Sequence, residues 1–156
     1  MSDSISRRDL GRLIGPALAG AAVACTPETS TRFWVTSLGE VEAGTVTFEY
    51  PPGHQAFILK LGQSAEGGLG ADADIVAFHS ACPHMGCPLS PAGDSLSAGE
   101  LGPCGCHQSR FDMRLGGRQI EGRATQGLVR VLLEIEDGEI YATGVEGTPF
   151  GEAPYA

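Results

Sequence analysis

The residues best suited to chemistry lie in two short segments of the chain. The first segment reads Cys82-Pro83-His84-Met85-Gly86-Cys87, and the second reads Cys104-Gly105-Cys106-His107-Gln108-Ser109. Together they hold four of the five cysteines and two of the four histidines. Thiolates and imidazoles at this density favour ligation of a soft or borderline transition metal.

Three kinds of metal site could use such residues. A structural zinc site usually takes its ligands from C-x₂₋₄-C and H-x₃₋₅-H pairs, which neither segment supplies. An all-cysteine [2Fe–2S] site of the plant type uses the spacing C-x₄-C-x₂-C, which is not present. The third kind is a [2Fe–2S] site with two cysteines on one iron and two histidines on the other, and it needs one cysteine and one histidine from each segment.

The pattern C-x-H-x-G-C followed by C-x-C-H-x-S-x-F-D resembles the paired boxes of Rieske proteins that contain a disulfide, and every fixed position is present. This resemblance implies a [2Fe–2S] cluster as the cofactor, one per chain. Cys82 and Cys104 would bind the inner iron, and His84 and His107 the outer iron. Two neutral imidazoles in place of two thiolates raise the reduction potential, to about −150 to +300 mV against about −400 mV for plant-type ferredoxins.

The same resemblance assigns roles to residues around the ligands. Cys87 and Cys106 would form a disulfide between the two segments. Ser109 stands where a hydroxyl donates to a bridging sulfide, and Phe111 stands where respiratory Rieske proteins often have a tyrosine that donates to a ligand cysteine. Because phenylalanine cannot donate a hydrogen bond, we expect a potential below the respiratory maximum. Gly86 is expected to supply a backbone shape that a Cβ would block.

Other residues near these segments have less specific interpretations. His54 and His79 have no cysteine at ligand spacing, so we interpret them as surface or packing residues. Met85 is expected to pack over the cluster. Residues 122–125 align with the third loop that covers the cluster in Rieske domains.

The remaining sequence predicts an all-β fold. Apolar stretches predict strands, and Asp137-Gly138 predicts a tight hairpin turn between the last two; these strands span 45–50, 57–61, 75–78, 128–135 and 140–143. With 23 glycines and 10 prolines, turns are favoured over long helices, and no amphipathic helix is expected after the N-terminal segment. The resemblance makes this a Rieske fold of antiparallel sheets at residues 26–156, with a cluster-binding subdomain inserted at about 79–126.

Residues 1–25 are ordered like a twin-arginine export signal. Arg7-Arg8 precedes an apolar stretch from Leu13 to Ala24, which ends in the cleavage pattern Ala22-Val23-Ala24. The stretch is shorter than the ~20 apolar residues of a membrane-spanning helix. We therefore expect a periplasmic protein, with membrane association through an uncleaved signal as an alternative. A lipid on Cys25 is a further alternative.

The overall charge narrows the classes of partner. The formal net charge is −9. Nucleic-acid binding needs a basic surface that neutralises phosphate, so no nucleic-acid partner is expected. An acidic surface can instead speed the encounter with a basic protein.

Segments outside the two boxes resemble the small subunit of arsenite oxidase. These segments are Gly67-Gly68-Leu69-Gly70, Gly122-Arg123-Ala124-Thr125, Arg130-Val131-Leu132-Leu133 and Thr143-Gly144-Val145-Glu146-Gly147. The resemblance implies a large partner subunit with molybdopterin and a [3Fe–4S] cluster, and a periplasmic cytochrome c or cupredoxin as the electron carrier. The favoured function is a non-catalytic electron relay between the two, with arsenite oxidation as the favoured reaction.

Two alternatives remain open from the sequence. Iodate reductase pairs with a very similar small subunit, and the substrate site would lie on the absent large subunit in either case. A Rieske subunit of a quinol-oxidising cytochrome bc complex would usually have a full membrane anchor and a tyrosine at position 111. No nucleophile with a general base is visible, so no catalytic residue and no substrate turnover are expected on this chain alone.

Overall fold

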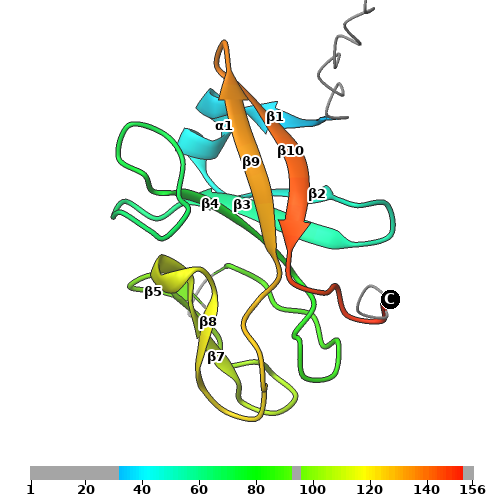
Figure 1. Ribbon diagram of the computed structural model, residues 1–156. Coiled ribbons are helices and arrows are strands. Elements are labelled where there is room, and N and C mark those ends of the chain that lie inside the picture. Colours follow the sequence, from blue (N-terminus) through cyan, green and yellow to red (C-terminus); the bar gives the residue numbers. More distant parts are fainter. Residues whose placement is uncertain (1–31, 93–95, 153–156) are drawn as a thin grey trace, which may run out of the picture.

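Two antiparallel sheets form the framework of residues 32–92 and 96–152, the part of the chain that the computed structural model describes (Figure 1). The larger sheet has six strands, in the spatial order β1 (Phe33–Ser37), β10 (Glu139–Glu146), β9 (Arg130–Glu136), β4 (Ile75–His79), β3 (Gln55–Lys60) and β2 (Val46–Glu49). The all-β prediction is confirmed. The proposed export signal, including Arg7, Arg8 and Cys25, lies outside the described residues.

Strands β3 and β4 are buried on both faces, which explains their continuous apolar sequences. Successive side chains of a strand point to opposite faces. Phe57 and Phe78 therefore belong to one apolar core, and their neighbours Ile58 and Ala77 belong to a second core. The first core also contains Cys82, so the central strands connect the sheet directly to the first box.

The smaller sheet lies between β4 and β9 in the sequence. Its strands are β5 (Leu96–Ser97), β6 (Glu100–Leu101), β7 (Arg110–Asp112) and β8 (Arg118–Glu121), with a 3₁₀ helix, η2 (Met113–Leu115), between the last two. Three loops flank these strands, and we call them the first loop (80–92), the second loop (102–109) and the third loop (122–129). All three lie at the lower end of the molecule in Figure 1.

One short helix, α1 (Leu38–Ala43), contradicts the expectation of no helix after the N-terminal segment. The Ser37 side chain accepts a hydrogen bond from the backbone N–H of Glu40, and the Glu40 side chain accepts one from the N–H of Ser37. This reciprocal capping satisfies groups that a helix end leaves unpaired, and the S-x-x-E signal was present in the sequence. Val41 then anchors the helix in the core.

Strand β9 begins two residues later than predicted. The N–H of Leu128 donates to the carbonyl of Gly117 at 2.8 Å, so it bonds to the turn before β8 and not to a neighbouring strand of the large sheet. Leu128 and Val129 are buried nonetheless. Their apolar character reflects packing at the end of the third loop, which the sequence pattern alone could not distinguish from a strand.

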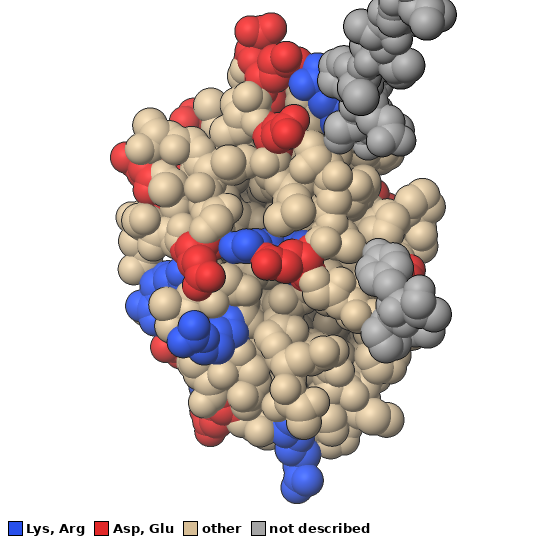
Figure 2. Space-filling view, viewed as in Figure 1, with Lys and Arg blue, Asp and Glu red and all other residues tan. Residues whose placement is uncertain are grey.

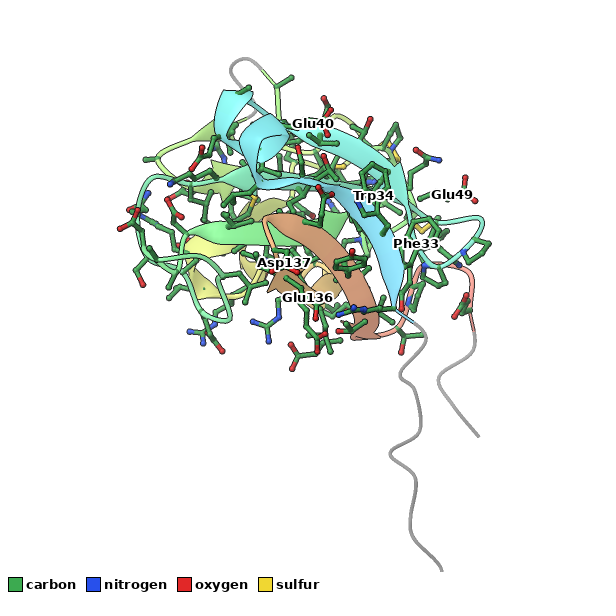
Figure 3. All side chains as sticks on the ribbon, turned by 90° about the horizontal axis from the view of Figure 1, so that it is seen from above. Phe33, Trp34, Glu40, Glu49, Glu136 and Asp137 are labelled. Carbon is green, nitrogen blue, oxygen red and sulfur yellow. A yellow bond between two sulfur atoms is a disulfide. The ribbon has the colours of Figure 1, made fainter. Side chains whose placement is uncertain are left out.

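Acidic side chains are distributed unevenly over the molecule (Figure 2). Seen from the end opposite the three loops, Phe33 and Trp34 of β1 share this end with Glu40, Glu136 and Asp137 (Figure 3). Phe33 and Trp34 are 48% and 54% exposed. The first and second loops, at the other end, contain no Asp, Glu, Lys or Arg. Charged side chains at the loop end therefore come from the third loop and the smaller sheet, and none comes from the first two loops.

Candidate metal centre

The two boxes fall on the first and second loops, each positioned by a strand. Strand β4 leads directly into the first loop, and β6 and β7 flank the second. Cys82 and Cys104 stand near the start of these loops and are each only 1% exposed. The strands thus bring two segments separated in sequence to one end of the fold.

The first and second loops have the same backbone hydrogen-bond pattern. The N–H of Cys82 donates to the carbonyl of Cys87 at 2.8 Å, and the N–H of Gly86 donates to the carbonyl of Cys82 at 2.8 Å. In the second loop, the corresponding bonds run from Cys104 to Ser109 at 2.8 Å and from Gln108 to Cys104 at 2.9 Å. Each loop is therefore a tight turn that closes on its own buried cysteine.

Cys82 and Cys104 are free thiols that lie close together in the first core. Burial raises the pKa of the Cys82 thiol, and the neighbouring Cys104 raises it further. Hydrogen bonding from the backbone N–H groups of His84 and Met85 opposes this rise in the pKa. A metal at this position would favour the deprotonated thiolates, because a coordinating thiol loses its proton.

The two imidazoles form the outer part of the site. The ring centroids of His84 and His107 lie 4.5 Å apart, with the ring planes at 88°. His107 is exposed, whereas His84 is half-buried. The Nδ1 atom of His84 is buried and has no hydrogen-bond partner among the described residues. A buried polar atom without a partner is costly, and a metal bond would satisfy it.

A disulfide joins the two loops. Cys87 and Cys106 are bonded, and they are 19 residues apart in the sequence. The expected pairing is confirmed. The bond connects the two tight turns at a point outside the pair of free thiols, so it restrains the loops independently of any metal.

The third loop packs against the second through Ser109. The Ser109 hydroxyl is buried and accepts hydrogen bonds from the backbone N–H groups of Arg123 and Ala124, at 3.1 and 3.0 Å. A hydroxyl has two lone pairs and one proton, so these contacts leave the proton available for donation. A Cβ at Gly122 would overlap the backbone of Ser109, so only glycine fits this close approach.

Phe111 and Gly86 also occupy special positions. Phe111 is fully buried and belongs to the same core as the two free thiols. Gly86 has a φ of 71°, and a Cβ there would overlap the ring of Phe150, so the expected need for glycine is confirmed. Met85 is 61% exposed, and its packing over the cluster stays a prediction.

His54 and His79 lie outside the ligand group but contact each other. Their rings stack with centroids 5.4 Å apart and planes at 11°. His79 is buried, and its Nε2–H donates to the carbonyl of Tyr50 at 2.9 Å. His54 contacts Glu152 at 2.7 Å. The interpretation as packing residues holds for His79, but no sequence signal indicated this stacked pair or its link to the C-terminal segment.

The donor set fits two metal atoms better than one. Within the described residues, no group of three or more His, Cys, Asp or Glu side chains converges on a single ion. The four candidate ligands instead form a thiol pair and an imidazole pair. This division suits a cluster in which two cysteines hold one iron and two histidines hold the other.

Comparison with known proteins decides the family. Residues 31–133, more than half of the chain, match the Rieske [2Fe-2S] domain family. The chain belongs to this family. This Rieske protein therefore carries a [2Fe–2S] cluster, and the expected cofactor is confirmed.

Two relatives of this Rieske protein share most of its length. It is 36% identical over 140 residues to iodate reductase subunit IdrB of Denitromonas iodatirespirans, covering 86% of this chain and 75% of that protein. It is 41% identical over 122 residues to the subunit of the same name from Pseudomonas sp. strain SCT, covering 75% and 62%. The cytochrome bc1 complex Rieske iron-sulfur subunit of Streptomyces lividans is 36% identical over 80 residues, covering 51% and 45%.

Solved structures show the same fold. The soluble domain of Rieske protein II from Sulfolobus acidocaldarius matches with a TM-score of 0.68 at 23% identity, covering 80% of this chain and 83% of that one. The plasma membrane Rieske protein PetC3 from Synechocystis matches with a TM-score of 0.54 at 19% identity, covering 70% and 96%. Among the described residues of this Rieske protein, no helix is long and apolar enough to span a membrane.

Proposed function

We propose that this Rieske protein is the electron-transfer subunit of a molybdenum-containing oxidoreductase of the iodate reductase type. The observation that supports this most directly is the 36% identity to iodate reductase subunit IdrB across 75% of that protein's length. Because these relatives are subunits of iodate reductase, we propose that a second chain carries the substrate site. The described fold is built around the candidate metal centre. This arrangement suits a subunit that relays electrons.

The proposed ligands are Cys82 and Cys104 for one iron and His84 and His107 for the other. The tight turns of the first and second loops hold the cysteines in the core and place the imidazoles at the outer side. When bound, the cluster takes up and releases single electrons. The backbone N–H groups directed at Cys82 stabilise negative charge on its sulfur and so favour the reduced form. With Phe111 unable to donate, the potential should lie below that of respiratory Rieske proteins.

The exposed side of His107 is the proposed point of electron exchange. Electron transfer between proteins needs a short gap between redox centres, and the buried cysteine side of the site is covered by the first core. The first and second loops carry no Asp, Glu, Lys or Arg, so close approach there separates few charges from water. We propose that the large molybdopterin subunit, carrying a [3Fe–4S] cluster, or the electron carrier contacts this end.

Arsenite oxidation is a second candidate reaction, because several segments resemble the small subunit of arsenite oxidase. Packing accounts for their glycines, however. A Cβ at Gly67 would overlap the guanidinium of Arg130, and one at Gly122 would overlap the backbone of Ser109. These segments thus meet demands of the fold that any small subunit of this type would share. They do not discriminate between arsenite and iodate.

The proposed location is the periplasm, reached by the twin-arginine route, with a cytochrome c or cupredoxin as the carrier. The support is the order of features in residues 1–25. The net charge of −9 would attract a basic carrier over long range. Replacing Arg7 and Arg8 with Lys should leave the protein in the cytoplasm, and full periplasmic yield of that variant would refute the route.

The test of function uses the protein together with its large subunit. The purified pair should oxidise a reduced periplasmic carrier when iodate is added, and a pair containing His107→Ala should not. Reduction of iodate by a small artificial donor, which can reach the large subunit directly, should survive in both. Carrier oxidation at an equal rate by the large subunit alone would refute the relay. Arsenite-dependent carrier reduction without iodate activity would select the second candidate.

A further inference from the structure

The segment after β10 returns to the end of the molecule that carries the metal centre. Residues 147–152 leave the large sheet and run beside the first loop (Figure 1). Pro149 is buried, and its carbonyl accepts a hydrogen bond from the N–H of Glu152 at 3.1 Å. This turn brings Phe150 against Gly86 of the first loop and Glu152 against His54.

Phe150 lies against the first loop at Gly86. The space that a Cβ on Gly86 would take is filled by the Phe150 ring. Gly86 stands between the candidate ligand His84 and the disulfide residue Cys87. Its N–H closes the turn onto the carbonyl of Cys82. The ring therefore supports the one residue whose left-handed backbone, at φ 71°, gives the first loop its shape.

Glu152 ties the same segment to the large sheet. Its Oε1 lies 2.7 Å from Nε2 of His54. The His54 ring stacks on the ring of buried His79, the last residue of β4. The His79 side chain in turn donates a hydrogen bond to the Tyr50 carbonyl. Between this anchor and Phe150 lies a cavity of about 310 Å³, lined in part by Gly86 and both histidines. The first loop thus has a void on this side, and Phe150 closes part of it.

The first loop also supplies donors to the candidate ligand sulfur. Hydrogen bonding from the N–H groups of His84 and Met85 opposes the rise in the pKa of Cys82, and these are the two residues before Gly86 in the turn. Their aim depends on the turn's shape, since Gly86 closes it. Donors to a ligand sulfur stabilise the more negative, reduced cluster and raise its reduction potential.

We infer that Phe150 is a positioning residue for the metal centre, which keeps the first loop closed so that its N–H groups point at Cys82, and that Glu152 holds Phe150 in place through His54. The inference rests on the proposed ligation by Cys82 and His84. Loss of the ring lets the turn relax into the cavity and weakens both N–H contacts. The reduction potential then falls, and the cluster is lost faster.

The test compares cluster-loaded full chains. Phe150→Ala should lower the midpoint potential in a potentiometric titration and shorten the half-life of the Rieske electron paramagnetic resonance signal several-fold on warming. Phe150→Leu, which keeps an apolar side chain on Gly86, should restore most of both. Glu152→Gln should shift the potential in the same direction by less. Leu115→Ala, which removes a similarly exposed apolar side chain (43% against 46%) from η2, should match wild type.

An unchanged potential in Phe150→Ala would overturn the inference. A raised potential would overturn it too, because it would mean that water entering the cavity outweighs the N–H contacts. If Phe150→Ala retains no cluster, Glu152→Gln decides instead: an unchanged or raised potential in that variant would overturn the inference. Failure of the proposed ligation is distinguishable, because His84→Ala would then keep the wild-type resonance signal whatever the result at Phe150.

Discussion

Gly86 and Gln108 are equivalent residues in two loops of the same backbone design. Each has a left-handed backbone, with φ of 71° and 62°, and each donates its N–H to the carbonyl of a buried cysteine four residues earlier. The first loop uses glycine because the Phe150 ring occupies the space of a Cβ. The second loop uses glutamine, a residue that carries a conformational cost in this region.

The two equivalent positions should respond oppositely to substitution. Gln108→Gly should leave the free energy of unfolding unchanged or raise it by up to about 1 kcal/mol, because glycine adopts a left-handed backbone without steric cost. Gly86→Ala should lower it by about 1–2 kcal/mol from backbone strain alone. Chemical denaturation of both variants measures the difference. A Gly86→Ala protein as stable as wild type would show that the first loop can reshape.

Ser109→Ala should weaken both the fold and the site. The substitution leaves the N–H groups of Arg123 and Ala124 without their acceptor, at a cost of about 1–3 kcal/mol for a buried group. It also removes a hydroxyl proton that is available for donation to the cluster, so the midpoint potential should fall. Ser80→Ala is the matched control, because the Ser80 hydroxyl donates to the Gln55 carbonyl at an exposed position. Equal unfolding free energies for the two variants would contradict this account.

His107→Ala should abolish the Rieske-type resonance signal. The prediction follows from the pairing of the His84 and His107 rings at 4.5 Å and from the family to which the chain belongs. His54→Gln removes an imidazole outside the three loops, and it should keep a signal of the Rieske type. Electron paramagnetic resonance of the reduced proteins decides the matter. A native signal in His107→Ala would refute the ligand assignment.

Cys87→Ser should accelerate cluster loss more than it changes the potential. The disulfide closes a loop of residues 87–106, and closing a loop of this size stabilises the folded state by about 3 kcal/mol in the chain-entropy model. The disulfide does not include Cys82 or Cys104, so the substitution leaves the hydrogen-bond donors to these ligand sulfurs in place. The rate at which the cluster absorbance disappears on heating measures the effect. An unchanged rate would mean that packing alone holds the two loops together.

Stability should decline in mild acid because of His79. Burial lowers the pKa of this imidazole, while the Tyr50 carbonyl raises it, His54 lowers it and Glu152 raises it. Its Nε2–H already donates to Tyr50, so protonation would place a second N–H on buried Nδ1, which has no partner among the described residues. The unfolded chain therefore binds this proton more readily, and the free energy of unfolding falls as the pH drops below about 6.5, an ordinary histidine pKa.

The measurement is the unfolding free energy of wild type and His79→Gln between pH 5 and pH 8. The glutamine amide can still donate to Tyr50 but does not titrate. The variant should therefore show a flatter dependence over this range. Parallel curves for the two proteins would place the acid sensitivity elsewhere.

The sequence by itself determined the chemistry of the site. Cysteine and histidine in the two boxes carry the resemblance to Rieske proteins, and that resemblance implied the candidate ligands and the disulfide partners. Continuous apolar segments likewise located β3 and β4, since strands buried on both faces have no polar side. The helix that the Ser37–Glu40 cap begins was not predicted, because its six residues are too few to show an apolar period.

Only the tertiary structure decided what supports the site. Gly86 and Gln108 look unrelated in the sequence, and their equivalence emerges from backbone hydrogen bonds that the loops make internally. The contacts of Phe150 with Gly86 and of Glu152 with His54 join residues more than 60 positions apart. Such contacts depend on how β10 ends and where the chain turns next, and no local pattern of residue types encodes that path. The candidate ligands follow from two local motifs that resemble those of Rieske proteins, whereas the packing that holds them follows from the whole fold.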